Sequence, residues 1–162
     1  MKWITRHRPK IDRIACPWLI ARFIDPDPQF LYVPPGDVLT TAASVGAVPY
    51  DVPGVELGHA GERCSFDAFI ARYDLQKPAL ARLATIVRGA DTGRLDLAPE
   101  CAGLHAFSLG LSRLYPDDHE MLSHGMVMYE ALYAWCELHT RADERDDPVP
   151  RIRTREGCKA SP

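Results

Sequence analysis

The chain has 162 residues, and hydrophobic residues make up 46% and charged residues 25% of it, values that exclude a disordered or fibrous protein and fit one globular domain. Its 19 Lys and Arg against 22 Asp and Glu give a net charge of −3, which argues against a general nucleic-acid binder. No apolar run approaches the ~18 residues of a membrane span or precedes the charged N-terminal residues as a signal peptide would. We therefore expect a cytoplasmic protein that, as this chain alone, binds neither membrane nor nucleic acid.

The five cysteines are scattered along the chain and form no Cys-x-x-Cys pair. The sequence therefore predicts neither a disulfide framework nor a zinc knuckle, and a reducing compartment fits best. Cys101 and Cys136 stand in apolar helical settings and are interpreted as core residues.

The first third of the chain predicts a βαβ unit. Short strands are expected at 2–5 and 30–33, with a helix at 17–24 between them. A short helix at 36–47 and a third strand at 48–52 follow.

From residue 65 onward the apolar periodicity favours helices. Helices are expected at 66–73 with Ser65 as N-cap, from Pro78 to an end at Gly89, from Pro99 with Leu104, Phe107, Leu111 and Leu114 inward, and at 117–140 with Asp117 or Asp118 as cap. The predicted fold class is α+β, with a small N-terminal sheet and βαβ-like unit followed by a mainly helical C-terminal bundle. Residues 1–140 form the predicted domain, and 141–162 a charged, flexible tail.

Cys16 precedes Pro17, and proline is favoured in the first turn of a helix. A helix that begins at Pro17 places the thiol near the N-cap, where the helix dipole lowers its pKa. Lys10 and Arg13 add positive charge, so this segment is the best candidate for an oxyanion site. The alternative is a small buried residue among apolar neighbours, namely Ile14, Trp18 and Leu19.

Two further clusters carry metal-ligand chemistry. Glu56 and His59 lie in a Gly- and Pro-rich loop, where the backbone can turn both side chains inward. Glu120 and His124 share one face at the start of the longest predicted helix, and His119 stands on an adjacent face. The alternatives are an exposed loop with incidental polar residues and an acidic N-terminal cap with surface histidines.

Asp91 lies in the turn that follows the predicted helix end at Gly89 and is either a ligand or a residue that stabilises the turn. Carboxylates and imidazoles thus occur in three separate segments, and a mixed oxygen and nitrogen donor set suits iron, manganese or zinc without distinguishing among them. The candidate metal ligands are Glu56, His59, Asp91, His119, Glu120 and His124. No P-loop, Gly-x-Gly-x-x-Gly, Gly-x-Ser-x-Gly or His-Glu-x-x-His motif is present, which argues against phosphoryl transfer, dinucleotide oxidoreduction and serine hydrolysis.

Several strings, in this order, resemble the chromate resistance protein family, specifically the C-terminal domain of ChrB-type proteins. They are residues 13–20 (RIACPWLI), 56–59 (ELGH), 64–67 (CSFD), 88–91 (RGAD) and 115–120 (YPDDHE), and the resemblance runs from about residue 5 to 140. It implies a link to bacterial chromate resistance. Full-length members carry an N-terminal region associated with regulation of efflux genes, and relatives occur fused to rhodanese-like domains. The chain has no room for either addition, so we do not expect a DNA-binding role.

Three functional hypotheses follow. The first is a metal-binding, enzyme-like domain in chromate or oxidative-stress defence, with Glu56, His59, Asp91 and His119 as ligands and Glu120 or His124 as a further ligand or base. The second is a chromate or metal sensor without turnover. The third, ranked lowest, is thiol chemistry at Cys16, alone or with Cys64. In each, a small oxyanion such as chromate is the expected partner; Lys10 and Arg13 would bind it, and Cys16 and Arg13 are the catalytic candidates. The sequence leaves open whether the chain forms a homo-oligomer.

Overall fold

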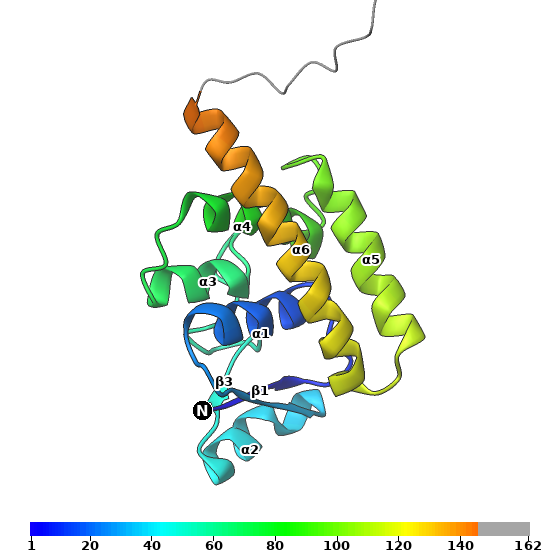
Figure 1. Ribbon diagram of the computed structural model, residues 1–162. Helices are drawn as coiled ribbons and strands as arrows, with labels where there is room; N and C mark the ends of the chain where they lie inside the picture. The colour runs from blue at the N-terminus through cyan, green and yellow to red at the C-terminus, as the bar shows by residue number, and fades with distance from the viewer. Residues whose placement is uncertain (146–162) are drawn as a thin grey trace, which may run out of the picture.

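The computed structural model describes residues 1–145, with side chains to residue 140, and places a small parallel sheet beside a group of helices (Figure 1). The strands β1 (Lys2–Arg6), β2 (Gln29–Val33) and β3 (Val48–Pro49) are ordered β2-β1-β3, and both pairs are parallel. The expected N-terminal βαβ unit is therefore confirmed.

Helices make up most of the rest, which confirms the α+β class. Within residues 1–145 no helix combines the length and the apolar character that crossing a bilayer demands. In chain order the helices are α1 (Asp12–Phe23), the short 3-10 turn η1 (Pro35–Asp37), α2 (Val38–Val45), α3 (Ser65–Arg72), α4 (Pro78–Thr92), α5 (Glu100–Leu114) and α6 (Asp118–Arg145).

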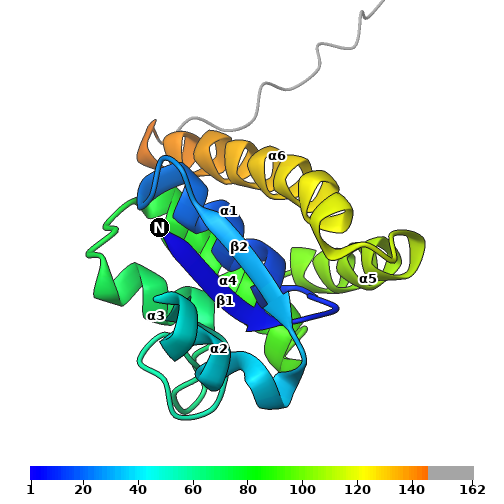
Figure 2. The ribbon, with the colours of Figure 1, turned by 90° about the horizontal axis from the view of Figure 1, so that it is seen from below.

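The two faces of the sheet are covered by different helices. Trp3 and Ile4 are neighbours on β1 and both fully buried, and a strand points successive side chains to opposite faces. Trp3 packs into the main core with α1, whereas Ile4 packs with Val38 and Ala42 of α2. Figure 1 shows α1 and α2 on opposite sides of the strands, and Figure 2 shows β1 and β2 side by side with α1 behind them. In such doubly wound sheets the ligand site lies at the carboxyl ends of the strands, where the two connections diverge. We call this end of the sheet the carboxyl edge.

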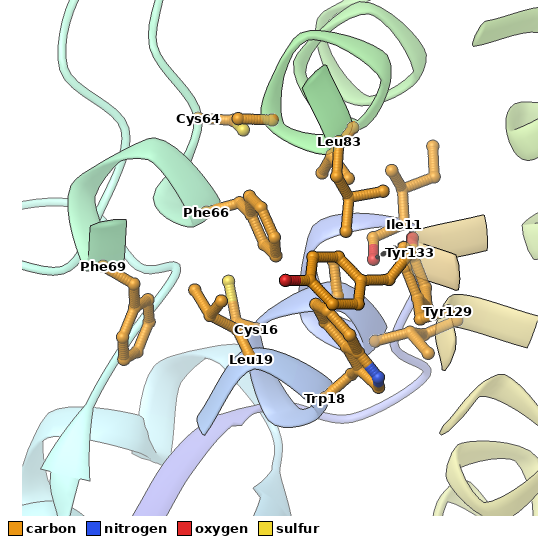
Figure 3. Packing of buried hydrophobic residues seen from close by; sticks show 14 of the residues in the cluster. Ile11, Cys16, Trp18, Leu19, Cys64, Phe66, Phe69, Leu83, Tyr129 and Tyr133 are labelled. Atoms are coloured by element: carbon orange, nitrogen blue, oxygen red, sulfur yellow. Dashed lines mark hydrogen bonds between the residues drawn. The ribbon is translucent and has the colours of Figure 1, made fainter. Parts of the chain in front are cut away.

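The helical bundle (α1, α4, α5 and α6) holds most of the apolar core. Tyr129 of α6 is fully buried, and its hydroxyl donates a 2.9 Å hydrogen bond to the carbonyl of Ile11. Figure 3 shows its ring beside Trp18. Gly125 lets α6 approach α1 closely, because a Cβ there would collide with Ile14.

Three helix boundaries differ from the prediction. Helix α3 begins at Ser65, and Cys64, not Ser65, is its N-cap. Helix α1 begins at Asp12, so Pro17 lies inside it. Helix α4 runs on to Thr92 and ends at Gly93, whose φ of 74° suits a glycine. Gly89 is instead an internal contact point, because a Cβ there would lie 2.7 Å from the carbonyl oxygen of Arg94.

The predicted inward face of α5 is only partly correct. Leu104 is buried, but Phe107 and Leu114 are 69% and 71% exposed, because the bundle covers only one side of this helix. The longest helix has the predicted cap, since Asp117 Oδ1 accepts the N–H groups of the second and third residues of α6. That helix continues to Arg145, into the expected tail, and residues 146–162 of the tail lie outside the described part of the chain.

Candidate metal centre

Four segments that are distant in the sequence meet at the carboxyl edge. The chain leaving β1 turns into α1 and brings Asp12, and the chain leaving β3 brings Asp51. The loop before α3 carries His59, and the last turn of α4 carries Asp91. The crossover topology, not closeness in sequence, therefore assembles the site.

The imidazole of His59 is the centre of this cluster. Its Nε2 lies 3.2 Å from Asp91 Oδ2, 3.2 Å from Asp51 Oδ1 and 3.5 Å from Asp12 Oδ2. One ligand atom from each of Asp12, His59 and Asp91 lies within 4.8 Å of the other two. Two carboxylates and one imidazole at this separation are a donor set that can hold one cation.

Asp12 is 1% exposed, and its carboxylate is held in place by backbone groups. Its Oδ2 accepts the N–H of Ser65 at 2.7 Å, and its Oδ1 accepts the N–H of Phe66 at 3.0 Å. These are orphan donors at the start of α3, so the carboxylate also faces the positive end of that helix. Asp12 is thus a preoriented side chain that links the candidate centre to α3.

Asp51 is held by arginines. Its Oδ2 accepts hydrogen bonds from Arg6 Nη2 at 2.9 Å and pairs with Arg13 Nε at 3.1 Å. The hydroxyl of Ser65 donates to its other oxygen at 3.1 Å. Because two guanidinium groups offset its charge, Asp51 contributes less negative charge to the centre than Asp12 and Asp91 do.

The pKa shifts show that the cluster attracts positive charge. The pKa of His59 is raised to about 9, first by its hydrogen bond to Asp12 and then by the charges of Asp12, Asp91 and Asp51, which outweigh the opposing effect of burial. The pKa of Asp91 is raised to about 7, first by burial and then by the negative charges of Asp12 and Asp51. A cation among these groups would relieve that repulsion.

Backbone strain gathers at the same edge. Among the described residues, Arg8, Ile11, Asp51 and Asp74 are the non-glycine residues with positive φ, and the first three lie in the segments that follow β1 and β3. Each such conformation costs on the order of 1–3 kcal/mol and is kept only where the surroundings enforce it. For Ile11, a β-branched residue at φ 36°, the cost is greatest.

Of the predicted metal ligands, the structure brings together only His59 and Asp91. Glu56 points away and pairs with Arg72, with Oε1 2.9 Å from Nε. The remaining candidates stand at the start of α6: the ring of His119 contacts Tyr32, His124 stacks on Tyr115 with ring centroids 4.1 Å apart, and Glu120 follows the Asp117 cap. None of these four residues belongs to the donor group found in the described part of the chain.

The prediction that a helix dipole lowers the pKa of Cys16 is wrong. Because α1 begins at Asp12, the thiol lies one turn inside the helix and is fully buried (Figure 3). Burial and then the charge of Asp12, whose Oδ1 lies 3.4 Å from Sγ, raise the pKa of Cys16 well above its ordinary value. Burial likewise raises the pKa of Cys64. Both thiols therefore stay protonated, which disfavours nucleophilic chemistry; a catalytic role for Cys16 stays an untested prediction.

The structure also separates the residues of the predicted oxyanion site. Lys10 is exposed, whereas Cys16 has no surface to share with it. Arg13 binds Asp51, and its pKa is lowered, chiefly by burial. Arg13 thus borders the candidate metal centre, while Lys10 and Cys16 do not form one pocket with it.

Sequence reasoning missed Asp12 and Asp51. The predicted helix begins at Pro17, so position 12 lies before it, in the basic segment interpreted as an oxyanion site, and its carboxylate is not considered as a ligand. The prediction places position 51 inside a strand at 48–52, but β3 ends at Pro49, so Asp51 follows the carboxyl end of the strand, where ligands gather.

The comparisons with known proteins agree on one family. The family model described as "ChrB, C-terminal domain" matches residues 3–136. Protein ChrB of Cupriavidus metallidurans is 34% identical over 133 residues, which cover 82% of this chain and 40% of that protein, so the chain spans less than half of that relative's length. No solved structure was found to match. The chain belongs to the family of ChrB C-terminal domains.

Proposed function

We propose that the chain is a metal-binding, enzyme-like domain that acts in chromate or oxidative-stress defence. The observation that carries the proposal is the convergence of Asp12, His59 and Asp91, whose ligand atoms lie within 4.8 Å of one another. The membership in the ChrB family supports the link to chromate. The third proposed ligand is Asp12, and not one of the four sequence candidates that lie elsewhere.

The donor chemistry restricts the ion to a small group. One imidazole and two carboxylates suit iron, manganese or zinc. His59 is 44% exposed, so solvent reaches the centre on its side, and three protein ligands leave a coordination position free for a substrate. The bound ion would supply Lewis-acid or redox chemistry there. Arg13, next to the centre and paired with Asp51, adds positive charge for an anionic substrate.

A sensor without turnover is the second candidate, and one observation favours it. Asp12 would bind the ion while its carboxylate also accepts the N–H groups of Ser65 and Phe66. Loading or loss of the ion would therefore act directly on the N-terminus of α3, which is the kind of coupling that a sensor needs.

Metal content tests the proposal. The purified chain is stripped with a chelator and titrated with Fe²⁺, Mn²⁺ and Zn²⁺ by calorimetry, and bound metal is counted by mass spectrometry. We expect one ion per chain for the wild type and at least a hundredfold weaker binding for His59→Ala and Asp91→Asn. His119→Ala is the matched control and should bind as the wild type does. Equal binding by all variants, or no binding by the wild type, would remove the proposed centre.

Titration of the metal-loaded protein with chromate and with sulfate separates enzyme from sensor. A sensor binds chromate without consuming it, whereas an enzyme changes it or a co-substrate over time. Cys16→Ser is included because unchanged chromate chemistry in that variant eliminates the thiol hypothesis.

A further inference from the structure

A cavity of about 470 Å³ lies beside the candidate metal centre. It is bounded by the last turns of α4, by the loop that leads into α3 and by the segment after α4. Its lining comprises Gly61, Glu62, Thr85, Arg88, Thr92, Arg94 and Leu97.

The cavity and the candidate centre share two stretches of chain. Arg88 and Thr92 lie on α4 three residues before and one residue after Asp91. Gly61 and Glu62 follow His59 in the same loop. A molecule in the cavity therefore lies against the same helix turn and the same loop that position two of the proposed ligands.

The two arginines of the lining are in different states. Arg94 is engaged, because its Nε and Nη2 each lie 2.9 Å from an oxygen of Asp96. Arg88 has only a loose ion pair, with Nε 3.6 Å from Asp67 Oδ2, and its buried Nε has no hydrogen bond. Among residues 1–140, whose side chains are described, its terminal amino groups have no hydrogen-bond partner either, although the side chain is only 27% exposed. Arg88 is thus a partly buried guanidinium with unused donors at a cavity wall.

We propose that this cavity binds an organic anion, with Arg88 anchoring its carboxylate or phosphate group; the proposal rests on the proposed metal function and names its substrate class. A guanidinium fork matches two oxygens of such a group. A cavity of about 470 Å³ falls in the range of small-molecule sites, roughly 300–1,000 Å³. A bare tetrahedral oxyanion, equivalent to a few water molecules of about 30 Å³ each, would fill only a fraction of it.

The other residues of the lining suit the uncharged, organic part of such an anion. Leu97 and the methyl groups of Thr85 and Thr92 offer apolar surface, and Glu62 offers an acceptor for a hydroxyl or amine on the same molecule. The substrate class is therefore a small organic acid or phosphate ester, bound against the helix turn and the loop that carry Asp91 and His59.

Nuclear magnetic resonance of the ¹⁵N-labelled, zinc-loaded full chain tests this inference. Benzoate and phenyl phosphate are the anionic probes, and benzamide is the neutral control. We expect saturable shifts of the amides of Gly61, Arg88 and Thr92 with the anions and none with benzamide. The probe that binds more tightly shows whether Arg88 binds a carboxylate or a phosphate group.

Three variants of two lining residues test the role of Arg88. Arg88→Gln should weaken binding of the preferred probe at least tenfold, and Arg88→Lys should weaken it less, because lysine keeps the charge but loses the fork. Arg94→Gln should stay within about twofold of wild type, because Asp96 already occupies that side chain. Shifts scattered outside the cavity, or equal affinity of Arg88→Gln and wild type, would overturn the inference.

Zinc counted in the same samples separates the two proposals. Normal zinc content with lost anion binding in Arg88→Gln supports the inference. Normal zinc content with no anion binding in the wild type overturns the inference alone. A wild type that takes no zinc overturns the metal function on which the inference rests.

Discussion

The carboxyl edge of the sheet and the helical bundle are stabilised in opposite ways. Around Tyr129 the bundle buries apolar side chains, and its helices approach closely where glycines remove a side chain. At the carboxyl edge, the acidic side chains of Asp12 and Asp51 are buried, and Ile11 holds a strained backbone. The bundle thus supplies free energy of folding, and the edge uses part of it to hold charged groups in place.

The largest expected effect is in the bundle. Gly125→Leu forces side-chain atoms into Ile14 and should push α6 away from α1. We expect a loss of about 3 kcal/mol or more and a fall in the unfolding midpoint of roughly 10 °C, followed by circular dichroism. Gly103→Ala, where a Cβ meets no atom within 4 Å, is the control. Equal midpoints for the two variants would contradict the close approach of these helices.

A smaller effect is expected at the edge. Asp51→Ala leaves Arg13 and Arg6 without their shared carboxylate and should cost about 1–3 kcal/mol in denaturant unfolding. Asp51→Asn keeps one acceptor oxygen and should cost less. If Asp51→Ala stabilised the metal-free chain, repulsion among the carboxylates would outweigh the arginine contacts.

The stability of the metal-free carboxyl edge should depend on pH. The folded pKa of His59, about 9, exceeds its ordinary 6.5, so its contribution is fully present below pH 6.5 and is lost as pH rises through 9. Asp91, raised from 3.8 to about 7, acts with the same sign at lower pH. We expect the thermal midpoint of the chelator-treated chain to fall as pH rises from 5 to 9.

The His59→Gln variant should flatten that fall between pH 6.5 and 9, since it removes the titrating imidazole. Binding of the ion should release close to one proton at pH 7.5, because His59 must lose its proton to become a ligand. Calorimetry in buffers of different ionisation enthalpy measures this number. Binding without proton release would mean that His59 is not a ligand.

The smallest effect is expected for the histidines of α6. His119→Ala removes one ring contact with Tyr32, and His124→Ala removes the stacking on Tyr115. Each should change stability by about 1 kcal/mol or less and leave metal content unchanged. Loss of metal in either variant would restore the ligand set that the sequence alone predicts.

The elements could be predicted from sequence because periodicity and caps act locally. Asp117 caps α6 as its position before the helix predicts. Residues 107 and 114 were misplaced because periodicity finds a face of a helix but not which neighbour covers it. The candidate site was only half predictable: His59 and Asp91 follow from loop and helix-end chemistry, whereas Asp12 joins them only through the β2-β1-β3 order.

The same strand order has a consequence for synthesis of the chain. The three proposed ligands are spread from residue 12 to residue 91, so no nascent chain that ends before residue 91 contains the complete ligand set. Contacts between such distant segments also form slowly, because the entropy of closing the long loops is lost before the contacts that stabilise them form. The ion should therefore be captured late, after α4 has left the ribosome, and a chain cut before residue 91 should never acquire it.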